Sequence, residues 1–399
     1  MNLISTNKDY KQKLQDTFIR YAKTWSESNG ETADKGIFPS TPQQRDFAKM
    51  VLQELKNLGI ESAVLTDDCY IYASIAGTGK LSDKESVLLL AHMDTVDEVS
   101  GKNVNPVILT GAAATEFTSD NDVIIKSDGS TLLGGDDKAG MAAIMTSLEY
   151  LLEHKDVEHR PFEIIFSPDE ETGHGMDKVP MDLIKSKFGY TVDGGEEGEM
   201  ETECFNAWAC TVEFTGKACH TGDGKKNGMI NANLMMAKFI SQLPADKRPE
   251  TTEGHEGFIA IMKTAGSIES ASCDLLLRAF TMDEINLEKR LIEKIGAAVE
   301  EETGGKVSVF FDQQYLNMKE NLDKNPQVVQ ILEKAFEMAK VKIINKPIRG
   351  GTDGSRLTEM GIPTPNIFTG AHEFHSRNEW VSLNQMSKAA DILLNILTN

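Results

Sequence analysis

Apolar residues near the start of the chain recur every three or four positions, which is the spacing of one face of a helix. They are Tyr10, Leu14, Phe18 and Tyr21. A second helix is predicted to begin at Pro42, because Thr41 suits the capping position and proline suits the first helical turn. Gly59 is expected to end this helix.

Three later runs are predicted to be strands that a parallel sheet buries on both faces, and the first of them is a continuous apolar run. They are Ser86–His92, Phe162–Ser167 and Gly189–Asp193. Lys138–Leu152, between the first two runs, is rich in alanine, methionine and leucine and is predicted to be a helix. Short strands over 62–65 and 70–74 precede them. Strands that alternate with helices predict an α/β fold with a mostly parallel sheet flanked by helices.

The pattern changes near residue 204, where Ala207–Thr215 alternates like a half-exposed strand. The elements that follow are a helix over Ile230–Leu243, strands over Phe258–Lys263 and Asp274–Thr281, a helix over Glu284–Glu301 and a strand over Lys306–Phe311. This βαββαβ order predicts a compact sheet with helices on one face.

After Gln314 the first pattern resumes, with a helix over Pro326–Ala339, a strand over Thr364–Phe368 and a C-terminal helix. The sequence therefore predicts one α/β domain, residues 1–203 and 314–399, interrupted by an inserted α+β domain, residues 204–313.

Composition narrows the classes of function. The chain has 399 residues, of which 40% are hydrophobic, so a sizeable core is expected. Its 41 basic and 62 acidic residues give a formal net charge of −21. Nucleic-acid binding needs a basic face, and anionic membranes also attract basic segments, so we expect neither nucleic acid nor membrane as a partner.

The cysteines and the first residues bear on location. Cys69, Cys204, Cys210, Cys219 and Cys273 are odd in number and show no CxxC spacing, so we expect reduced thiols. The opening MNLISTNKDYKQKLQ lacks the apolar stretch of a secretory signal. No run approaches the roughly 18 apolar residues of a membrane helix. These features predict a cytoplasmic location.

Polar residues that suit metal chemistry stand at or just after the ends of the predicted strands, or before a helix. They are His92 and Asp94, Asp136 and Asp137, Glu170 and Glu171, Asp193, and His375. Each alone has an ordinary explanation, since an aspartate after a strand is more often a turn former or a helix cap. Parallel strands, however, bring their carboxyl ends to one crevice, so the whole set is expected to converge.

Imidazole and carboxylate ligands without a thiolate suit Zn²⁺, Mn²⁺ or Co²⁺. One carboxylate can bridge two ions, and a spare one must take the proton of the attacking water. Glu170 and Glu171 are adjacent, so one can be the base and the other a ligand. Asp94, two residues after His92, faces the same side of an extended strand and can orient its imidazole.

The sequence does not support other kinds of catalytic site. The sequence has no HExxH motif, no phosphate-binding loop and no GxSxG elbow. Cys219 and His220 are neighbours in sequence, which does not make a nucleophile–base pair. The residues themselves therefore predict a metal-dependent hydrolase.

Several stretches, spread over nearly the whole chain, resemble the M20 family of two-zinc metallopeptidases. They are HMDT (92–95), SGKNVNP (100–106), TLLGGDDKAG (131–140), SPDEE (167–171), YTVDGG (190–195), PETTEG (249–254), YLNMKE (315–320), KPIRGGTDGS (346–355) and NIFTG (366–370). PETTEG and PIRGGTDG, together with the others, resemble the peptidase T branch, which contains tripeptide aminopeptidases.

The resemblance implies a role for each candidate. Asp136 would bridge two Zn²⁺ ions, with Mn²⁺ or Co²⁺ as alternatives. His92 and Asp193 would complete one site, and Glu171 and His375 the other. Glu170 would be the general base, Asp94 would orient His92, and Asp137 would not be a ligand.

The resemblance also implies that the insert is a lid and a dimerisation domain, and that the protein is a homodimer acting on short peptides. His220 would stabilise the oxyanion, in its own or the partner's site. Arg349, and secondarily Arg278, would bind the carboxylate of the peptide. Around His220 the sequence reads ACHTGDGKKNG where the family has HPG, so a rigidifying proline is missing.

The ligand set leaves sibling M20 activities open, namely a dipeptidase, a carboxypeptidase or an N-acyl amino acid hydrolase. A binding protein on an inactive scaffold would lack a ligand or the base, and all are present here. We therefore expect hydrolysis of the N-terminal peptide bond of short peptides, chiefly tripeptides.

Overall fold

The computed structural model describes residues 2–118 and 121–399, and the chain divides into two compact units. The first unit comprises Met1–Thr202, Met318–Lys346 and Thr352–Asn399, and the second comprises Glu203–Asn317 and Pro347–Gly351. The short segment Pro347–Gly351 thus joins the second unit, although the sequence pattern had left it in the surrounding α/β part. None of the helices in the described residues has the length and apolar character needed to cross a lipid bilayer.

The first unit is built on a sheet of eight strands. In spatial order these are β1 (Val64–Leu65), β2 (Ile71–Ile75), β6 (Phe162–Ser167), β3 (Val87–His92), β7 (Gly189–Gly194), β14 (Asn366–Phe368), β8 (Glu199–Glu201) and β13 (Ile344–Asn345). The four central strands β6, β3, β7 and β14 run parallel, while β2 and β8 flank them antiparallel. The predicted α/β fold with a mostly parallel sheet is confirmed.

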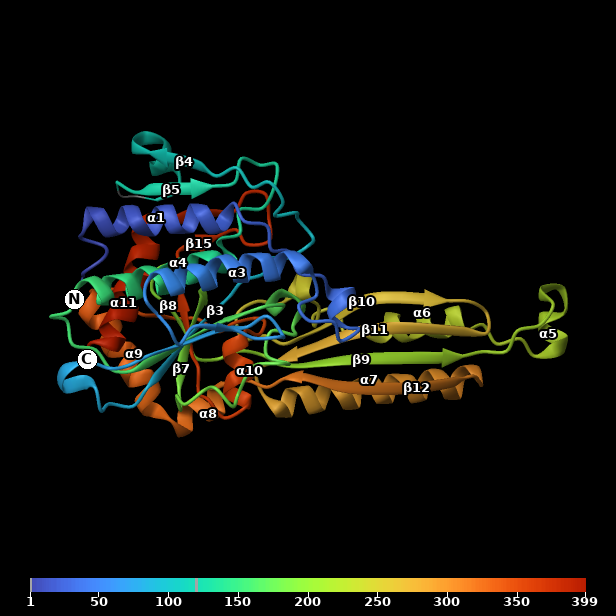
Figure 1. The fold of residues 1–399 in the computed structure, drawn as a ribbon. Coiled ribbons are helices and arrows are strands. Elements are labelled where there is room, and N and C mark those ends of the chain that lie inside the picture. Colours follow the sequence, from blue (N-terminus) through green and yellow to red (C-terminus); the bar gives the residue numbers. More distant parts are fainter. Residues whose placement is uncertain (1, 119–120) are drawn as a thin grey trace. The chain divides into compact units, whose positions relative to one another are not determined.

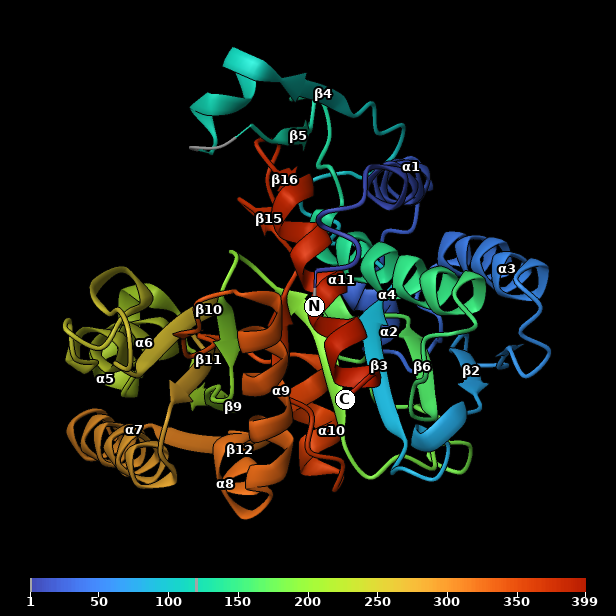
Figure 2. The same ribbon diagram turned by 90° about the vertical axis from the view of Figure 1, so that its left-hand side faces the viewer.

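Helices cover both faces of this sheet (Figures 1 and 2). On one face α4 (Gly135–Glu153) packs on β3 and β7, and α1 (Lys8–Ala22) and α11 (Leu383–Leu397) pack against α4. On the other face Leu88 and Leu90 of β3 cluster with Leu357 of α10 (Asp353–Glu359). The remaining helices of the unit are α2 (Gly30–Ala33), α3 (Pro42–Asn57), α8 (Lys319–Lys324) and α9 (Pro326–Ala339).

The two predicted N-terminal helices form with the expected apolar faces. In α1 the side chains of Tyr10, Leu14, Phe18 and Tyr21 are all buried. Helix α3 begins at Pro42 as predicted, and Thr41 occupies the capping position. The Thr41 hydroxyl does not cap the helix, however, because it donates to the backbone oxygen of Glu27 instead.

The sequence pattern did not reveal a small second sheet in the first unit. Its strands, in spatial order, are β15 (Ala371–His372), β16 (Trp380–Ser382), β5 (Val123–Lys126) and β4 (Val107–Thr110). Strands this short show too few alternations to stand out from loops. The sheet matters because the segment between β15 and β16 carries His375.

The second unit has one antiparallel sheet in the order β10 (Phe258–Gly266), β11 (Ser270–Ala279), β9 (Asn206–Thr215) and β12 (Lys306–Tyr315). Helices α6 (Ala232–Gln242) and α7 (Met282–Thr303) pack on it around a shared apolar core. The order is the predicted βαββαβ, with one further short helix, α5 (Gly224–Asn227), before α6.

The close packing of α4 on β7 generates a prediction about Gly140. A methyl group there would lie 1.9 Å from the backbone oxygen of Val192 and 2.3 Å from Oδ1 of Asp137. The backbone oxygen has no room to withdraw, so Gly140→Ala should lower the free energy of unfolding by about 3 kcal/mol, the upper part of the range for overpacking. Urea unfolding followed by circular dichroism measures this.

Gly30 provides the matched control. It lies in α2, and a methyl group added there would have nothing within 4 Å. Gly30→Ala should change the stability by less than about 0.5 kcal/mol, as surface substitutions usually do. Equal stabilities of the two variants would contradict the packing argument.

Candidate active site

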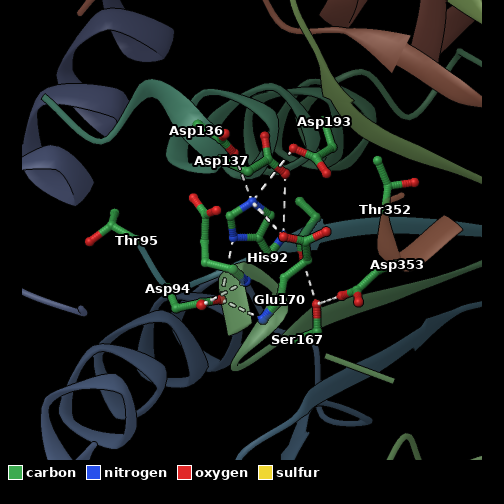
Figure 3. A network of polar contacts seen from close by, with 12 residues as sticks. His92, Asp94, Thr95, Asp136, Asp137, Ser167, Glu170, Asp193, Thr352 and Asp353 are labelled. Carbon is green, nitrogen blue, oxygen red and sulfur yellow. Dashed lines mark hydrogen bonds and ion pairs between the residues drawn. The ribbon is translucent and has the colours of Figure 1, made fainter. Parts of the chain in front are cut away.

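The candidate metal ligands and their acidic neighbours lie near the carboxyl ends of the central strands of the first unit, and Figure 3 labels His92, Asp94, Asp136, Asp137, Glu170 and Asp193 among them. His92 ends β3 and Asp193 lies near the end of β7. Glu170 and Glu171 form a short 3₁₀ turn just after β6. Asp136 stands at the start of α4. Neighbouring parallel strands thus deliver side chains that lie far apart in the sequence to one crevice.

Asp136 lies between the two imidazoles of the site. Its Oδ1 is 2.8 Å from Nε2 of His92, and its Oδ2 is 3.2 Å from Nε2 of His375. Each carboxylate oxygen therefore faces a different imidazole nitrogen. This is the arrangement required of a carboxylate that is shared by two metal ions.

The other carboxylates divide between the two imidazoles. Asp193 Oδ1 lies 3.5 Å from Nε2 of His92, and Glu171 Oε2 lies 3.1 Å from Nε2 of His375. Glu170 Oε2 is further away, at 4.0 Å from Nε2 of His92. The structure thus brings together the five predicted ligands, with Glu170 beside them.

Asp94 is fully buried behind His92 and holds two parts of the site. Its Oδ1 lies 3.3 Å from Nδ1 of His92, an ion-pair distance, although this nitrogen has no well-aligned hydrogen-bond partner. The same carboxylate accepts the backbone N–H groups of Glu170 at 3.0 Å and Glu171 at 3.1 Å. Asp94 therefore fixes the glutamate turn and faces the far side of the imidazole.

Asp137 supports the strand end rather than facing the crevice. Its Oδ2 accepts the backbone N–H of His92 at 3.2 Å, and its Oδ1 accepts that of Gly140 at 3.1 Å. One carboxylate oxygen of Asp137 also lies within 4.8 Å of a ring nitrogen of His92 and a carboxylate oxygen of Asp193. Both oxygens of Asp137 are therefore engaged by main-chain N–H groups.

The crowded carboxylates shift one another's ionisation. Burial, reinforced by the charge of Asp136, raises the pKa of Asp193 to about 6 and that of Glu171 to about 8. Burial also raises the pKa of Glu170 well above its usual value. Burial works against ionisation of Asp136 too, but hydrogen bonds from His375 and His92 hold its pKa below the usual range.

The imidazoles carry the opposite shift. Hydrogen bonds to Asp136 and Glu171 raise the pKa of His375 to about 11. Burial opposes the charging of His92, yet Asp193 and Asp136 raise its pKa well above the usual value. The surrounding field is therefore strongly negative and attracts positive charge.

This donor set fits divalent cations. Ligand atoms of His92, Asp136 and Glu171 lie within 4.8 Å of one another. In the described part of the chain, the ion-pairing partners of the site carboxylates are the two imidazoles, and no lysine or arginine neutralises them within 4.0 Å. Buried carboxylates without counter-charges are costly, so a bound cation would relieve their repulsion.

Sequence reasoning missed two buried charged residues behind the site. Glu379 is 1% exposed, and its carboxylate accepts backbone N–H groups of the loop before Asp136. Lys138, also 1% exposed, donates to the backbone oxygen of Thr24, and burial lowers its pKa to about 7. Lys138 lies in the GGDDKAG motif and Glu379 lies shortly after His375, and in both segments the sequence drew attention to other residues.

Asp353 and Ser167 form a further buried pair that the sequence did not single out. The Ser167 hydroxyl donates to Oδ2 of Asp353 at 2.5 Å. Burial raises the pKa of Asp353 to about 7. The pair ties the end of β6 to the start of α10 in the first unit (Figure 3).

His220 belongs to the second unit, and its side chain is 80% exposed. Its Nδ1 accepts the backbone N–H of Gly222 at 3.2 Å, which leaves the proton of a neutral ring on Nε2. Nδ1 also lies 4.0 Å from Asp223. The imidazole therefore presents an N–H donor to its surroundings.

Arg349 is also in the second unit and is engaged there by the PETTEG loop. Its Nη1 donates to the backbone oxygens of Gly254 and Glu256, both at 2.8 Å. Its Nη2 donates to the hydroxyl of Thr252 at 3.0 Å. The guanidinium thus joins two motifs that lie about a hundred residues apart in the sequence.

Arg278 is held in a similar way. Its Nη1 donates to the backbone oxygens of Leu277 at 3.0 Å and Trp208 at 3.3 Å, and its Nη2 donates to Gln314 at 2.8 Å. Both guanidinium groups are thus engaged inside the second unit.

Comparisons with known proteins agree with this geometry. The sequence profile of peptidase family M20/M25/M40 matches residues 88–399. Peptidase T from Clostridium perfringens strain 13 is 38% identical and covers 97% of this chain and 98% of its own length. Peptidase T from Shouchella clausii is also 38% identical over the same shares.

Solved structures show the same fold. An aminopeptidase PepT from Bacillus cereus superposes with a TM-score of 0.78 at 22% identity, and covers 97% of this chain and 98% of its own. A tripeptidase from Staphylococcus aureus gives the same values. A dinuclear metal-binding M20 peptidase from Bacillus subtilis superposes with a TM-score of 0.68 at 12% identity, and covers 98% of each chain. From its sequence profile and its relatives, the chain belongs to the M20 family of metallopeptidases, within the peptidase T group.

Proposed function

We propose that this protein is a metal-dependent aminopeptidase that removes the N-terminal residue of short peptides, chiefly tripeptides. The observation that carries the proposal is the Asp136 carboxylate, with one oxygen facing His92 and the other facing His375. Hydrolysis is the chemistry for which such a bridged pair of sites is used. The substrate class follows the printed names of the relatives, peptidase T and tripeptidase.

The proposed cofactor is a pair of Zn²⁺ ions, with Mn²⁺ or Co²⁺ as alternatives that the same ligands accept. Asp136 would be shared by both ions. His92 and Asp193 would complete one site, and Glu171 and His375 the other. When bound, the ions would polarise the scissile carbonyl and lower the pKa of the attacking water.

The residues of the chain supply the proton transfers. Glu170 is the proposed general base, because its carboxylate stands beside the ligands without being held by His375 as Glu171 is. It takes a proton from the attacking water on Oε2 and later gives it to the leaving amine. Asp94 holds the backbone N–H groups of both glutamates, so it sets the position of the base.

We propose that the second unit acts as a lid that brings His220 to the substrate. The ring is exposed and presents its Nε2 proton, so it is free to donate a hydrogen bond to an oxyanion. Arg349 and Arg278 remain the proposed partners of the peptide carboxylate. The missing proline near His220 suggests that this loop adapts when substrate binds.

We also propose a cytoplasmic homodimer. None of the five cysteines forms a disulfide in the described residues and four of them are buried, which agrees with a reducing compartment. Strand β10 stands at an edge of the second sheet and exposes Ile261 and Met262, which are 41% and 62% exposed. An exposed edge strand with apolar side chains is suited to pairing with another chain, and here the proposed partner is a second copy.

The dimer proposal predicts the mass in solution. Light scattering should give 2 × 43.9 kDa for the native chain. Met262→Lys places a charge on the edge strand and should shift the mass toward 43.9 kDa without changing the far-ultraviolet circular dichroism. A native mass of 43.9 kDa would contradict the proposal.

The assignment of the base predicts that two adjacent substitutions differ in their effect on metal content. Glu170→Gln should lower kcat for a tripeptide by about 10²- to 10⁴-fold, the usual contribution of a general base, while two metal ions remain bound. Glu171→Gln should lose metal as well as activity, because it removes a proposed ligand. Steady-state kinetics and elemental analysis of each variant measure the two effects.

In this pair each variant is the other's control, since the change is the same and the positions are neighbours. Normal turnover in Glu170→Gln would remove Glu170 from the mechanism. Full metal content in Glu171→Gln would remove Glu171 from the ligand set.

The substrate proposal predicts a selective pattern of cleavage. A free tripeptide should lose its first residue, while the same peptide with an acetylated N-terminus, and the corresponding dipeptide, should be cleaved far more slowly. A chelator should abolish hydrolysis, and Zn²⁺, Mn²⁺ or Co²⁺ should restore it. Chromatography of the products measures this, and cleavage of the acetylated peptide at the free-peptide rate would favour the sibling acyl hydrolase activity instead.

A further inference from the structure

We infer that Glu379 is the positioning residue of the metal centre, and that its carboxylate holds the loop before Asp136 so that each Asp136 oxygen faces one imidazole. The inference rests on the proposed function, because it takes Asp136 to be the shared ligand. Glu379 itself touches none of the proposed ligand side chains through its carboxylate, so it would act through the main chain.

The carboxylate of Glu379 gathers three backbone amides. Its Oε2 accepts the N–H groups of Leu133 and Gly134, both at 2.8 Å, and its Oε1 accepts that of Asp136 at 3.1 Å. The side chain is 1% exposed, so water does not compete for these bonds. Hydrogen bonds from amides to a buried carboxylate are stronger than neutral ones, so this loop is held firmly.

The loop closes tightly around this carboxylate. A methyl group on Gly135 would lie 3.0 Å from Oε1 of Glu379 and 2.9 Å from Cγ2 of Val381. No side chain fits at this position without displacing the carboxylate or β16. The absence of a side chain at Gly135 therefore lets the loop approach Glu379 closely. This explains the second glycine of the GGDD motif.

Glu379 also connects Asp136 with the other imidazole. It lies four residues after His375, in the same segment between β15 and β16. Its backbone oxygen accepts the N–H of Ser127 at 2.9 Å, which anchors that segment beside β5. Glu379 thus ties the loop of Asp136 to the segment of His375. Oδ2 of Asp136 lies 3.2 Å from Nε2 of His375.

A glutamine at position 379 would not hold the loop as the glutamate does. Glutamine has the size of glutamate but only one accepting oxygen, and its NH₂ group would face an N–H donor. At least one of the three loop amides would then be buried without a partner, which is costly. The loop would relax, and Asp136 would no longer present its two oxygens in the same directions.

The experiment compares Co²⁺ binding by the native chain and two variants after removal of metal by dialysis. Glu379→Gln should bind Co²⁺ about 10- to 100-fold more weakly, the usual effect of residues that orient ligands, with a changed visible absorption spectrum. Amide hydrogen exchange in the peptide over 131–137 should also become faster. Glu379→Asp keeps the charge but withdraws it by one methylene, and should weaken binding in the same way.

Glu163 offers a matched control in the same unit. It is also 1% exposed, and its carboxylate accepts the N–H groups of Ser186 at 2.7 Å and Lys185 at 2.9 Å and the hydroxyl of Tyr72 at 2.6 Å. Glu163→Gln should disturb a buried carboxylate to a similar degree. It should leave Co²⁺ affinity within about twofold of the native value, because Glu163 contacts no loop that carries a ligand.

The outcomes separate this inference from the proposed function. Native Co²⁺ affinity and spectrum in both Glu379 variants would overturn the inference alone, and so would an equal loss in Glu163→Gln. Failure of the native chain to bind two Co²⁺ ions would overturn the proposed function, and the inference with it.

Discussion

The architecture of the first unit depends on holding several carboxylates close together in a buried place. Asp136, Asp193 and Glu171 lie within ion-pair reach of only two imidazoles. Such a cluster repels itself, and burial makes the repulsion stronger because the dielectric is low. The cluster is therefore unfavourable for the folded chain alone and becomes favourable when cations occupy it. Stability is given up at this point so that positive charge can bind.

The main chain is what makes this concentration of charge possible. Asp94 accepts two backbone amides, Asp137 accepts two, and Glu379 accepts three. None of the three is a proposed metal ligand. Each carboxylate accepts N–H groups of a segment that carries a proposed ligand or the proposed base. The directions in which those side chains point are therefore fixed by the backbone. In the pair Asp136–Asp137, the first residue is a proposed ligand and the second supports the main chain.

The fold and much of the site could be predicted from the sequence, and the failures have physical causes. Phe162–Ser167 was predicted to the residue, because bulky apolar residues dominate it and Pro161 and Pro168 stand at its two ends. The sheet of β15, β16, β5 and β4 was missed, because strands of two to four residues show too few alternations to stand out from loops. Glu379 was missed because a glutamate beside arginine, asparagine and tryptophan looks like surface in sequence, and only the fold reveals that three amides converge on it.

Arg349 shows that a residue of a family motif can have a structural role. The sequence marks PETTEG and PIRGG as signatures, and in the second unit the guanidinium of Arg349 donates to Gly254, Glu256 and Thr252. Phe205 and Phe258 lie close to its charge, with ring centroids 5.2 Å and 5.7 Å from Cζ. A residue with this many internal partners holds the segment 347–351 to its unit whether or not substrate is present. If Arg349 binds the peptide carboxylate as proposed, substrate recognition and the seating of this segment depend on the same side chain.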